Sequence, residues 1–280
     1  MSKPTDIERV SQNRVVKLFK EELNYTYLGD WEEREGNSNI EEEYLTNYLK
    51  RKGYSDEHIS KAIFELQQEA TNFSDSLYTT NKNVYSKLRN GVKIKVSVSE
   101  NYDTVKLINW QDPEDNDFYI AEEVTVKGNK NKRPDIVLYI NGIAIAVLEL
   151  KRGIVDIGEG VRQNISNLQE RFIKPFFATN QILFAGNDSE GLRYGTISSP
   201  EKFYLSWKED VEDNSHLLLD KYLVKMCSKE RIIELIYDFI VFETGIKKLP
   251  RAHQYFGVKE SQKYVNRYEG GIIWHTQGSG

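Results

Sequence analysis

Two apolar runs joined by Asn141 and Gly142 constrain the fold of this chain more than any other part of the sequence. The runs, residues 136–140 and 143–150, are rich in Val, Ile and Leu, as buried strands are. Asn-Gly between two strand-like runs is the strongest short-range signal of a β-hairpin. The sequence therefore predicts a buried hairpin within a sheet.

Three charged side chains lie at the end of this hairpin away from the turn. Asp135 precedes the first strand, and Glu149 and Lys151 close the second. Two carboxylates can hold a divalent cation through oxygen ligands, and Lys151 points the same way as Glu149 because side chains alternate along a strand. Metal-assisted phosphodiester hydrolysis needs such a trio. The alternative is a hairpin that merely carries charges at its solvated ends.

The register of the hairpin decides whether the two carboxylates meet. A plain two-residue turn pairs Asp135 with Leu148, so that Glu149 points to the opposite face of the sheet. The expected site therefore requires an odd-length loop, which suits Asn-Gly with glycine in the left-handed position, or a β-bulge. Either change moves Asp135 opposite Val147 or Glu149.

The sequence Pro134-Asp135, the apolar hairpin and Glu149-Leu150-Lys151 together resemble the PD-(D/E)xK nuclease motif. The surrounding chain resembles the N-terminal part of the R (restriction) subunit of type I restriction-modification enzymes along nearly all of its length. Besides the hairpin, the resemblance rests on the segment 27–41, on residues 195–196 and on a motor-like ending.

The resemblance implies an α/β fold with a mixed β-sheet flanked by helices, followed by the beginning of a RecA-like motor domain. It implies a Mg²⁺-dependent endodeoxyribonuclease in which Asp135, Glu149 and the carbonyl of Leu150 bind the metal. Lys151 would activate water or stabilise the charge on the phosphate. The full-length enzyme would use ATP to translocate double-stranded DNA before cutting it, and would assemble with modification and specificity subunits.

Glu41 is a further candidate for the catalytic site. It lines up with Leu45 and Leu49 on the apolar side of a helix expected over residues 40–52, and nucleases of this family often have an acid on the helix before the sheet. It is expected to support the metal or to orient a bound water. The alternative is a solvated acidic first turn, favoured by the helix dipole.

Gln163 is a candidate on a helix expected near residues 158–172. Type I R subunits typically carry a Gln-x-x-x-Tyr motif at this place, thought to support the active site. The glutamine matches, but Asn167 stands at the tyrosine position. Gln163 is expected to hydrogen-bond near the metal or the DNA, while the departure at Asn167 weakens the match. The alternative is a polar helix surface.

The last thirty residues carry a separate resemblance. Residues 251–255 resemble the adenine-reading Q motif of superfamily 2 motors, and 271–280 resemble a strand and its phosphate loop. The phosphate-loop lysine would follow Gly280, so no ATP hydrolysis is expected of residues 1–280. A flexible Gly-Ser-Gly tail added by cloning is the alternative. The expected nucleotide-binding residues are Gln254, Gly278, Ser279 and Gly280.

Periodicity along the chain predicts helices followed by strands, the hairpin, a crossover helix and two more strands. This order makes a mixed sheet flanked by helices. The expected nuclease domain spans residues 1–215, and linker helices with the start of the motor domain span 216–280. The expected helices are 15–23, 40–52, 56–70 and 158–172, and the expected strands are 92–98, 105–110, 118–126, 136–140, 143–150, 181–185 and 192–197.

Composition excludes several classes of protein and limits the DNA-binding role. No run approaches the roughly 18 apolar residues of a membrane span. Neither a secretory leader nor more than one cysteine is present, so a cytoplasmic location is expected. The net charge of −5 argues against tight independent binding to duplex DNA.

We therefore expect partner subunits, or other parts of a longer polypeptide, to deliver the DNA. The rival interpretations are a free-standing exonuclease or repair nuclease with the same core, and a docking domain whose nuclease residues are vestigial. A free-standing nuclease would need a DNA-binding surface of its own, which the negative net charge disfavours.

Overall fold

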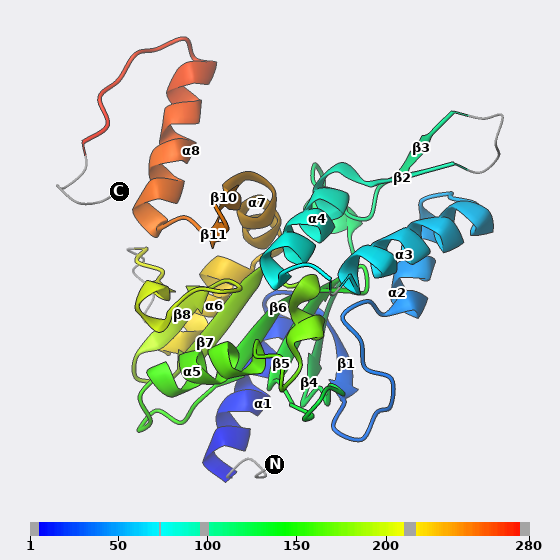
Figure 1. The fold of residues 1–280 in the computed structure, drawn as a ribbon. Coiled ribbons are helices and arrows are strands. Elements are labelled where there is room, and N and C mark those ends of the chain that lie inside the picture. Colours follow the sequence, from blue (N-terminus) through cyan, green and yellow to red (C-terminus); the bar gives the residue numbers. More distant parts are fainter. Residues whose placement is uncertain (1–5, 73, 96–100, 210–216, 275–280) are drawn as a thin grey trace.

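In the described part of the chain, seven strands form one mixed sheet flanked by helices (Figure 1). The computed structural model describes residues 6–72, 74–95, 101–209 and 217–274. The strand order is β1-β4-β5-β6-β7-β8-β9. The β1–β4 and β6–β7 pairs are parallel, and the other neighbouring pairs are antiparallel. The strands are β1 (Thr26–Asp30), β4 (Phe118–Glu122), β5 (Ile136–Ile140), β6 (Ile143–Leu150), β7 (Ile182–Asn187), β8 (Gly191–Gly195) and β9 (Leu205–Ser206).

The central hairpin, β5 and β6, is buried on both faces, as its apolar sequence predicts. One face, which includes Ile136 and Leu148, packs against α1 (Asp6–Glu21) and α6 (Leu218–Cys227). The other face, which includes Val137 and Val147, is covered by α5 (Gly158–Asn167) and the short helix η2 (Lys174–Ala178). The strands β6 and β7 are parallel because α5 forms the crossover between them.

Three helices gather around the turn end of the hairpin. They are α2 (Glu42–Arg51), α3 (Asp56–Ala70) and α4 (Leu77–Asn90), followed by a separate antiparallel pair, β2 (Val92–Ile94) and β3 (Asp103–Val105). In Figure 1 this pair projects on the side of the molecule away from α5. The open end of the hairpin, with Asp135 and Glu149, is therefore free of these helices.

The expected mixed sheet flanked by helices is confirmed, while several element bounds differ. The helix expected over residues 56–70 is α3, but α4 was not expected, and α5 ends at Asn167 rather than near residue 172. Of the strand expected over 92–98, residues 92–94 form β2, residue 95 has no regular secondary structure, and residues 96–98 lie outside the described residues. None of the described helices is long and apolar enough to cross a membrane.

The C-terminal part begins with helices that join the main core. Both α6 and α7 (Lys229–Phe239) contribute to the apolar cluster beneath the sheet. The expected domain boundary between residues 215 and 216 lies outside the described residues and stays a prediction. A small hairpin, β10 (Val241–Glu243) and β11 (Ile246–Lys248), leads to α8 (Ala252–Asn266), which stands away from the sheet (Figure 1). Of the strand and loop expected at 271–280, residues 271–274 have no regular secondary structure, and 275–280 lie outside the described residues.

Candidate active site

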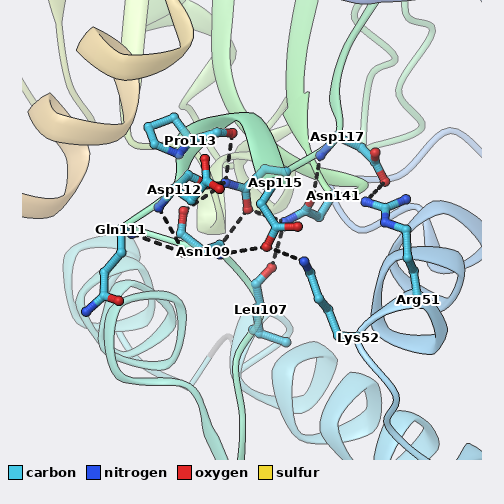
Figure 2. Close-up of polar contacts among 11 residues, drawn as sticks. Arg51, Lys52, Leu107, Asn109, Gln111, Asp112, Pro113, Asp115, Asp117 and Asn141 are labelled. Atoms are coloured by element: carbon cyan, nitrogen blue, oxygen red, sulfur yellow. Dashed lines mark hydrogen bonds and ion pairs between the residues drawn. The ribbon is translucent and has the colours of Figure 1, made fainter.

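The hairpin turn is held in a two-residue conformation by the side chain of Asn141. Asn141 and Gly142 have φ angles of 52° and 85°, which is the type I′ geometry that this dipeptide favours. The Asn141 N–H donates to the carbonyl of Asp117 (2.8 Å), and its side-chain oxygen accepts from the Asp117 N–H (2.7 Å). Its amide nitrogen donates to the Leu107 carbonyl and to the Asn116 side chain, each at 2.9 Å (Figure 2). These bonds fix the turn at two residues.

Two cations at the end of α2 secure the loop that holds this turn. Arg51 pairs with Asp117 at 2.9 Å, and Lys52 pairs with Asp115 (Figure 2). Asp115 also accepts from the side chain of Asn109 at 2.6 Å. The turn is thus fastened to the helical end of the molecule, and any change of register must occur within the strands.

A β-bulge in β6 supplies the change of register that the site requires. Near the turn the pairing follows the two-residue register, but Leu138 pairs with Ala146, which leaves Ile145 as an extra residue in β6. Consistent with this, Ile145 and Ala146 both pack into the same apolar cluster. Beyond the bulge, the register brings Asp135 opposite Glu149. The sequence allowed an odd-length loop or a bulge, and the bulge is confirmed.

Asp135 and Glu149 form a pair of carboxyls in which Glu149 is buried and Asp135 is half-buried. The side chain of Glu149 is inaccessible to solvent, and it is hydrogen-bonded to the carboxyl of Asp135. Burial, and secondly the negative charge of Asp135, raise the pKa of Glu149 well above its usual range. One oxygen of Asp135 also accepts from the Leu150 N–H at 2.6 Å. A positive charge between the two carboxyls would relieve their repulsion.

Lys151 brings positive charge to this pair. Its ammonium donates to the main-chain carbonyl of Leu150 at 3.0 Å, and its charge lowers the pKa of Glu149, opposing burial and Asp135. The ammonium therefore lies at the same end of the hairpin as both carboxyls, with its Leu150 partner directly after Glu149. The expected trio is brought together.

Helix α5 supplies a hydrogen-bond donor to each oxygen of Glu149. The Gln163 side chain donates to one oxygen at 2.5 Å, and the Asn167 side chain donates to the other at 3.1 Å. The close approach of α5 depends on Gly160, where a Cβ would lie 3.1 Å from the Cβ of Ala185 on β7. Gln163 occupies the expected place near the carboxyls. Asn167 also contacts the site, although it departs from the usual tyrosine.

Glu41 does not join the carboxyl pair, contrary to its expected role. Its N–H donates to the carbonyl of Gly142 at 2.8 Å, which places it at the turn end of the hairpin. Its carboxylate accepts from Arg34 at 2.6 Å and from the Ser38 N–H at 2.8 Å. The helical pattern correctly predicted an inward-facing side chain, but it contains no information about which end of the sheet the helix covers.

Glu123 is a buried acid beside the site that the sequence reading did not select. Its N–H donates to the carbonyl of Asp135 at 2.9 Å, and its carboxylate pairs with the Nε of Arg133 at 2.7 Å. Burial raises the pKa of Glu123, and the charge of Asp135 raises it further. Two consecutive acids at 122 and 123, directly after an apolar run, were the available signal, because acids are rarely buried without a partner and both of these are buried.

Of the expected nucleotide-binding residues, the structure describes Gln254 alone. The Gln254 side chain accepts from the Arg251 N–H at 2.9 Å and so caps the start of α8. Gly278, Ser279 and Gly280 lie outside the described residues. The structure therefore gives Gln254 a capping role, and the expected phosphate loop stays a prediction.

Comparison with known proteins identifies the family. The family described as "Type I restriction enzyme R protein N terminus" matches residues 7–202. A putative type I restriction enzyme MjaVIIIP endonuclease subunit from Methanocaldococcus jannaschii is 31% identical over 92% of this chain. The type I restriction enzyme HindI endonuclease subunit from Haemophilus influenzae is 29% identical over 73% of it. The matches span 27% and 21% of these two relatives, about a quarter of their length. The chain belongs to the family of type I restriction enzyme R proteins and corresponds to their N-terminal region.

Proposed function

We propose that this chain carries the DNA-cutting centre of a type I restriction enzyme, a Mg²⁺-dependent endodeoxyribonuclease. The observation that carries the proposal is the pairing of Asp135 with Glu149 beside the ammonium of Lys151. The curated relatives are named as endonuclease subunits, which supports a hydrolytic role for the same region. The three residues have the chemistry that phosphodiester hydrolysis needs, and they come from one hairpin.

The donor set fits a magnesium ion better than a metal held entirely by protein side chains. Among the described residues, no three or more His, Cys, Asp or Glu side chains form a group that could hold a metal. Mg²⁺ is commonly bound through one or two carboxylates together with waters and substrate phosphates. The carboxylates of Asp135 and Glu149 and the carbonyl of Leu150 would hold it. When bound, it would polarise the phosphate and lower the pKa of a coordinated water.

The remaining residues act on the geometry and charge of the site. Lys151 stabilises negative charge that develops on the scissile phosphate, because its ammonium is fixed beside the carboxyl pair by the Leu150 carbonyl. Gln163 and Asn167 hold both oxygens of Glu149, which keeps the carboxylate in one orientation. Because Glu149 is buried, bulk water does not compete with the metal for its carboxylate oxygens.

The wider role follows from the family and remains part of the proposal. In the full-length protein, ATP-driven translocation would bring duplex DNA to this site, and modification and specificity subunits would complete the assembly. The net charge of −5 supports delivery of the DNA by these other parts. On this proposal the site cleaves the DNA, and other parts of the enzyme recognise the DNA sequence.

Conservative substitutions test the assignment in the assembled enzyme. Asp135→Asn, Glu149→Gln and Lys151→Met should each abolish DNA cleavage while ATP-driven translocation continues. Glu43→Gln, an exposed acid on α2, is the matched control and should cut normally. Loss of ATP hydrolysis with cleavage retained would refute the assignment.

Metal titration separates this function from a vestigial docking domain. Calorimetry with Mn²⁺ or Mg²⁺ should show weaker binding for Asp135→Asn than for the unsubstituted chain. Equal affinity would indicate that the carboxyl pair no longer serves a metal. Efficient cutting without ATP or partner subunits would instead favour a free-standing nuclease.

A further inference from the structure

A short basic loop lies immediately before Asp135 and is firmly anchored. The main chains of Val126 and Lys132 pair through two hydrogen bonds of 2.9 and 3.2 Å, which close the loop at its base. The side chain of Asn131 accepts from the Gly128 N–H at 3.3 Å, and the side chain of Asn129 donates to the Glu170 carbonyl at 2.9 Å. Residues 127–131 are all exposed, so the loop presents its side chains to solvent on a fixed frame.

The segment after α5 joins this loop to form one surface. The ammonium of Lys132 lies 4.1 Å from the ring centroid of Phe172, and the guanidinium of Arg171 lies 4.8 Å from the same centroid. A side chain at Gly128 would collide with the carbonyl of Phe172, so the two segments are in close contact. We call Lys127, Lys130, Lys132 and Arg171 the basic rim.

Charge sets the basic rim apart from the rest of this acidic chain, which has 38 Lys and Arg against 43 Asp and Glu. Many Lys and Arg side chains form ion pairs with Asp or Glu. Next to the rim, Arg133 pairs with Glu32 and Glu123, and Lys174 pairs with Glu170. Among the described residues, no member of the rim forms an ion pair with a carboxylate. The rim is therefore a local excess of positive charge in a protein whose net charge is negative.

The basic rim lies beside the carboxyl pair. Lys132 precedes Asp135 by three residues, and the main-chain pairing at the base of the loop continues to the site, because the Val124 N–H donates to the Pro134 carbonyl at 3.0 Å. Arg171 follows α5, the helix whose Gln163 and Asn167 bind Glu149. A phosphate held at the rim would thus be close to a phosphate held at the carboxyl pair.

We propose that the basic rim binds the sugar-phosphate backbone of duplex DNA next to the cleavage point. The inference rests on the proposed nuclease function and adds the surface that holds the substrate. Exposed lysines act as point charges toward phosphates. Asn129 and Asn131, the side chains in the loop best suited to read base edges, each use one group of the amide on a main-chain partner, which leaves neither with both groups for a bidentate contact with a base. Binding at the rim is therefore independent of base sequence.

The test measures duplex binding by the full chain carrying Asp135→Asn, so that bound DNA stays uncut. Fluorescence anisotropy of a labelled duplex is recorded over a salt series that starts at low ionic strength. Lys127→Ala combined with Lys130→Ala should lower the slope of log affinity against log salt by about 2, since each phosphate contact contributes about 0.9. Lys127→Arg combined with Lys130→Arg keeps the charge and should keep the slope.

Lys82→Ala combined with Lys93→Ala is the matched control. Both lysines are exposed, and Lys93 lies on β2, on the side of the molecule away from α5 (Figure 1). The control should bind as the parent does, and duplexes of unrelated sequence should lose affinity equally with the rim variant. Equal losses in the rim and control variants, or no measurable binding by the parent at the lowest salt, would overturn the proposal.

Cleavage assays keep this inference distinct from the proposed function. In the assembled enzyme with Asp135 intact, the rim variant should cut DNA more slowly at low DNA concentration and recover at high concentration. If the rim variant binds weakly but Asp135→Asn still cuts, the rim holds DNA and the catalytic assignment fails. If Asp135→Asn abolishes cutting and the rim variant binds normally, the nuclease assignment stands and the rim is rejected.

Discussion

The carboxyl of Glu149 contacts the carboxyl of Asp135 even though the hairpin that carries them ends in a two-residue turn. The extra residue that makes this possible, Ile145, is held by partners outside the hairpin. Its carbonyl accepts from the Gln181 N–H at 2.7 Å, and the N–H of the preceding residue, Ala144, donates to a carbonyl at 2.9 Å in the segment before α2. The geometry of the site thus depends on neighbouring segments as well as on the hairpin.

The raised pKa of Glu149 predicts that stability falls as pH rises in the metal-free chain. Below the ordinary value of 4.5, Glu149 is protonated in both folded and unfolded chains. Above 4.5 the unfolded chain releases its proton first, so stability decreases until the pH passes the raised pKa of the folded state. Asp135→Asn removes the second cause of the shift. It should therefore raise the free energy of unfolding at pH 8 by about 1–2 kcal/mol.

Urea unfolding between pH 4 and 8 with a chelator present measures this effect. Asp112→Asn, an exposed loop acid, is the control and should leave the pH dependence unchanged. Added Mg²⁺ should stabilise the parent more than Asp135→Asn, because the metal replaces the proton as the neutralising charge. A parent chain whose stability rises steadily from pH 5 to 8 without metal would contradict the shared-site interpretation.

Glu41 should affect stability rather than cutting. Its carboxylate is buried and paired with Arg34, so Glu41→Gln should lower the free energy of unfolding by about 1–3 kcal/mol. DNA cleavage by the assembled enzyme should remain close to normal at a temperature where the variant is folded. Glu43→Gln, an exposed position on α2 two residues after Glu41, should change neither the stability nor the cleavage rate. Loss of cleavage in folded Glu41→Gln would restore the catalytic role expected from the sequence.

The turn should tolerate little change. Gly142 has a φ of 85°, and a Cβ there would lie 2.7 Å from the carbonyl of Glu41. Gly142→Ala should therefore cost about 2 kcal/mol or more in denaturant unfolding. Asn141→Gly keeps the positive φ but removes the side-chain bonds to Asp117, Leu107 and Asn116, and should cost about 2–3 kcal/mol. A neutral Asn141→Gly would show that backbone conformation alone fixes the turn.

Local patterns were sufficient to predict the hairpin and the charged residues at its end. The apolar runs, the Asn-Gly turn and the spacing of Glu149 and Lys151 are properties of a few neighbouring residues, and the structure confirms the hairpin that they predict. The bulge at Ile145 could not be chosen over an odd-length loop, because its main-chain partners lie in distant segments. Glu41 was misplaced for the same reason, since helix periodicity gives a face but not a position along the sheet.

The sequence supported Gln163 more strongly than Asn167 as a site residue, but the structure places both side chains against Glu149. Gln163 matched a familiar pattern, while Asn167 departed from it, yet each binds one oxygen of Glu149. A tyrosine hydroxyl and an asparagine amide are both hydrogen-bond donors. Asn167 can therefore donate a hydrogen bond at this position although it is not a tyrosine, a point that sequence matching alone does not reveal.

Gln163→Ala and Asn167→Ala should each weaken metal binding and cleavage by about 10–100-fold, because partners that orient a ligating carboxylate typically contribute that much. Removing either donor also leaves an oxygen of buried Glu149 without its partner, so the pKa of Glu149 should rise further and the pH needed for cleavage should shift upward. Calorimetry with Mn²⁺ and cleavage rates across pH 6–9 measure both effects. Glu159→Gln, an exposed position on the same helix, is the control. If the α5 variants lose stability but keep metal affinity and an unshifted pH profile, the two amides serve packing alone and do not position Glu149.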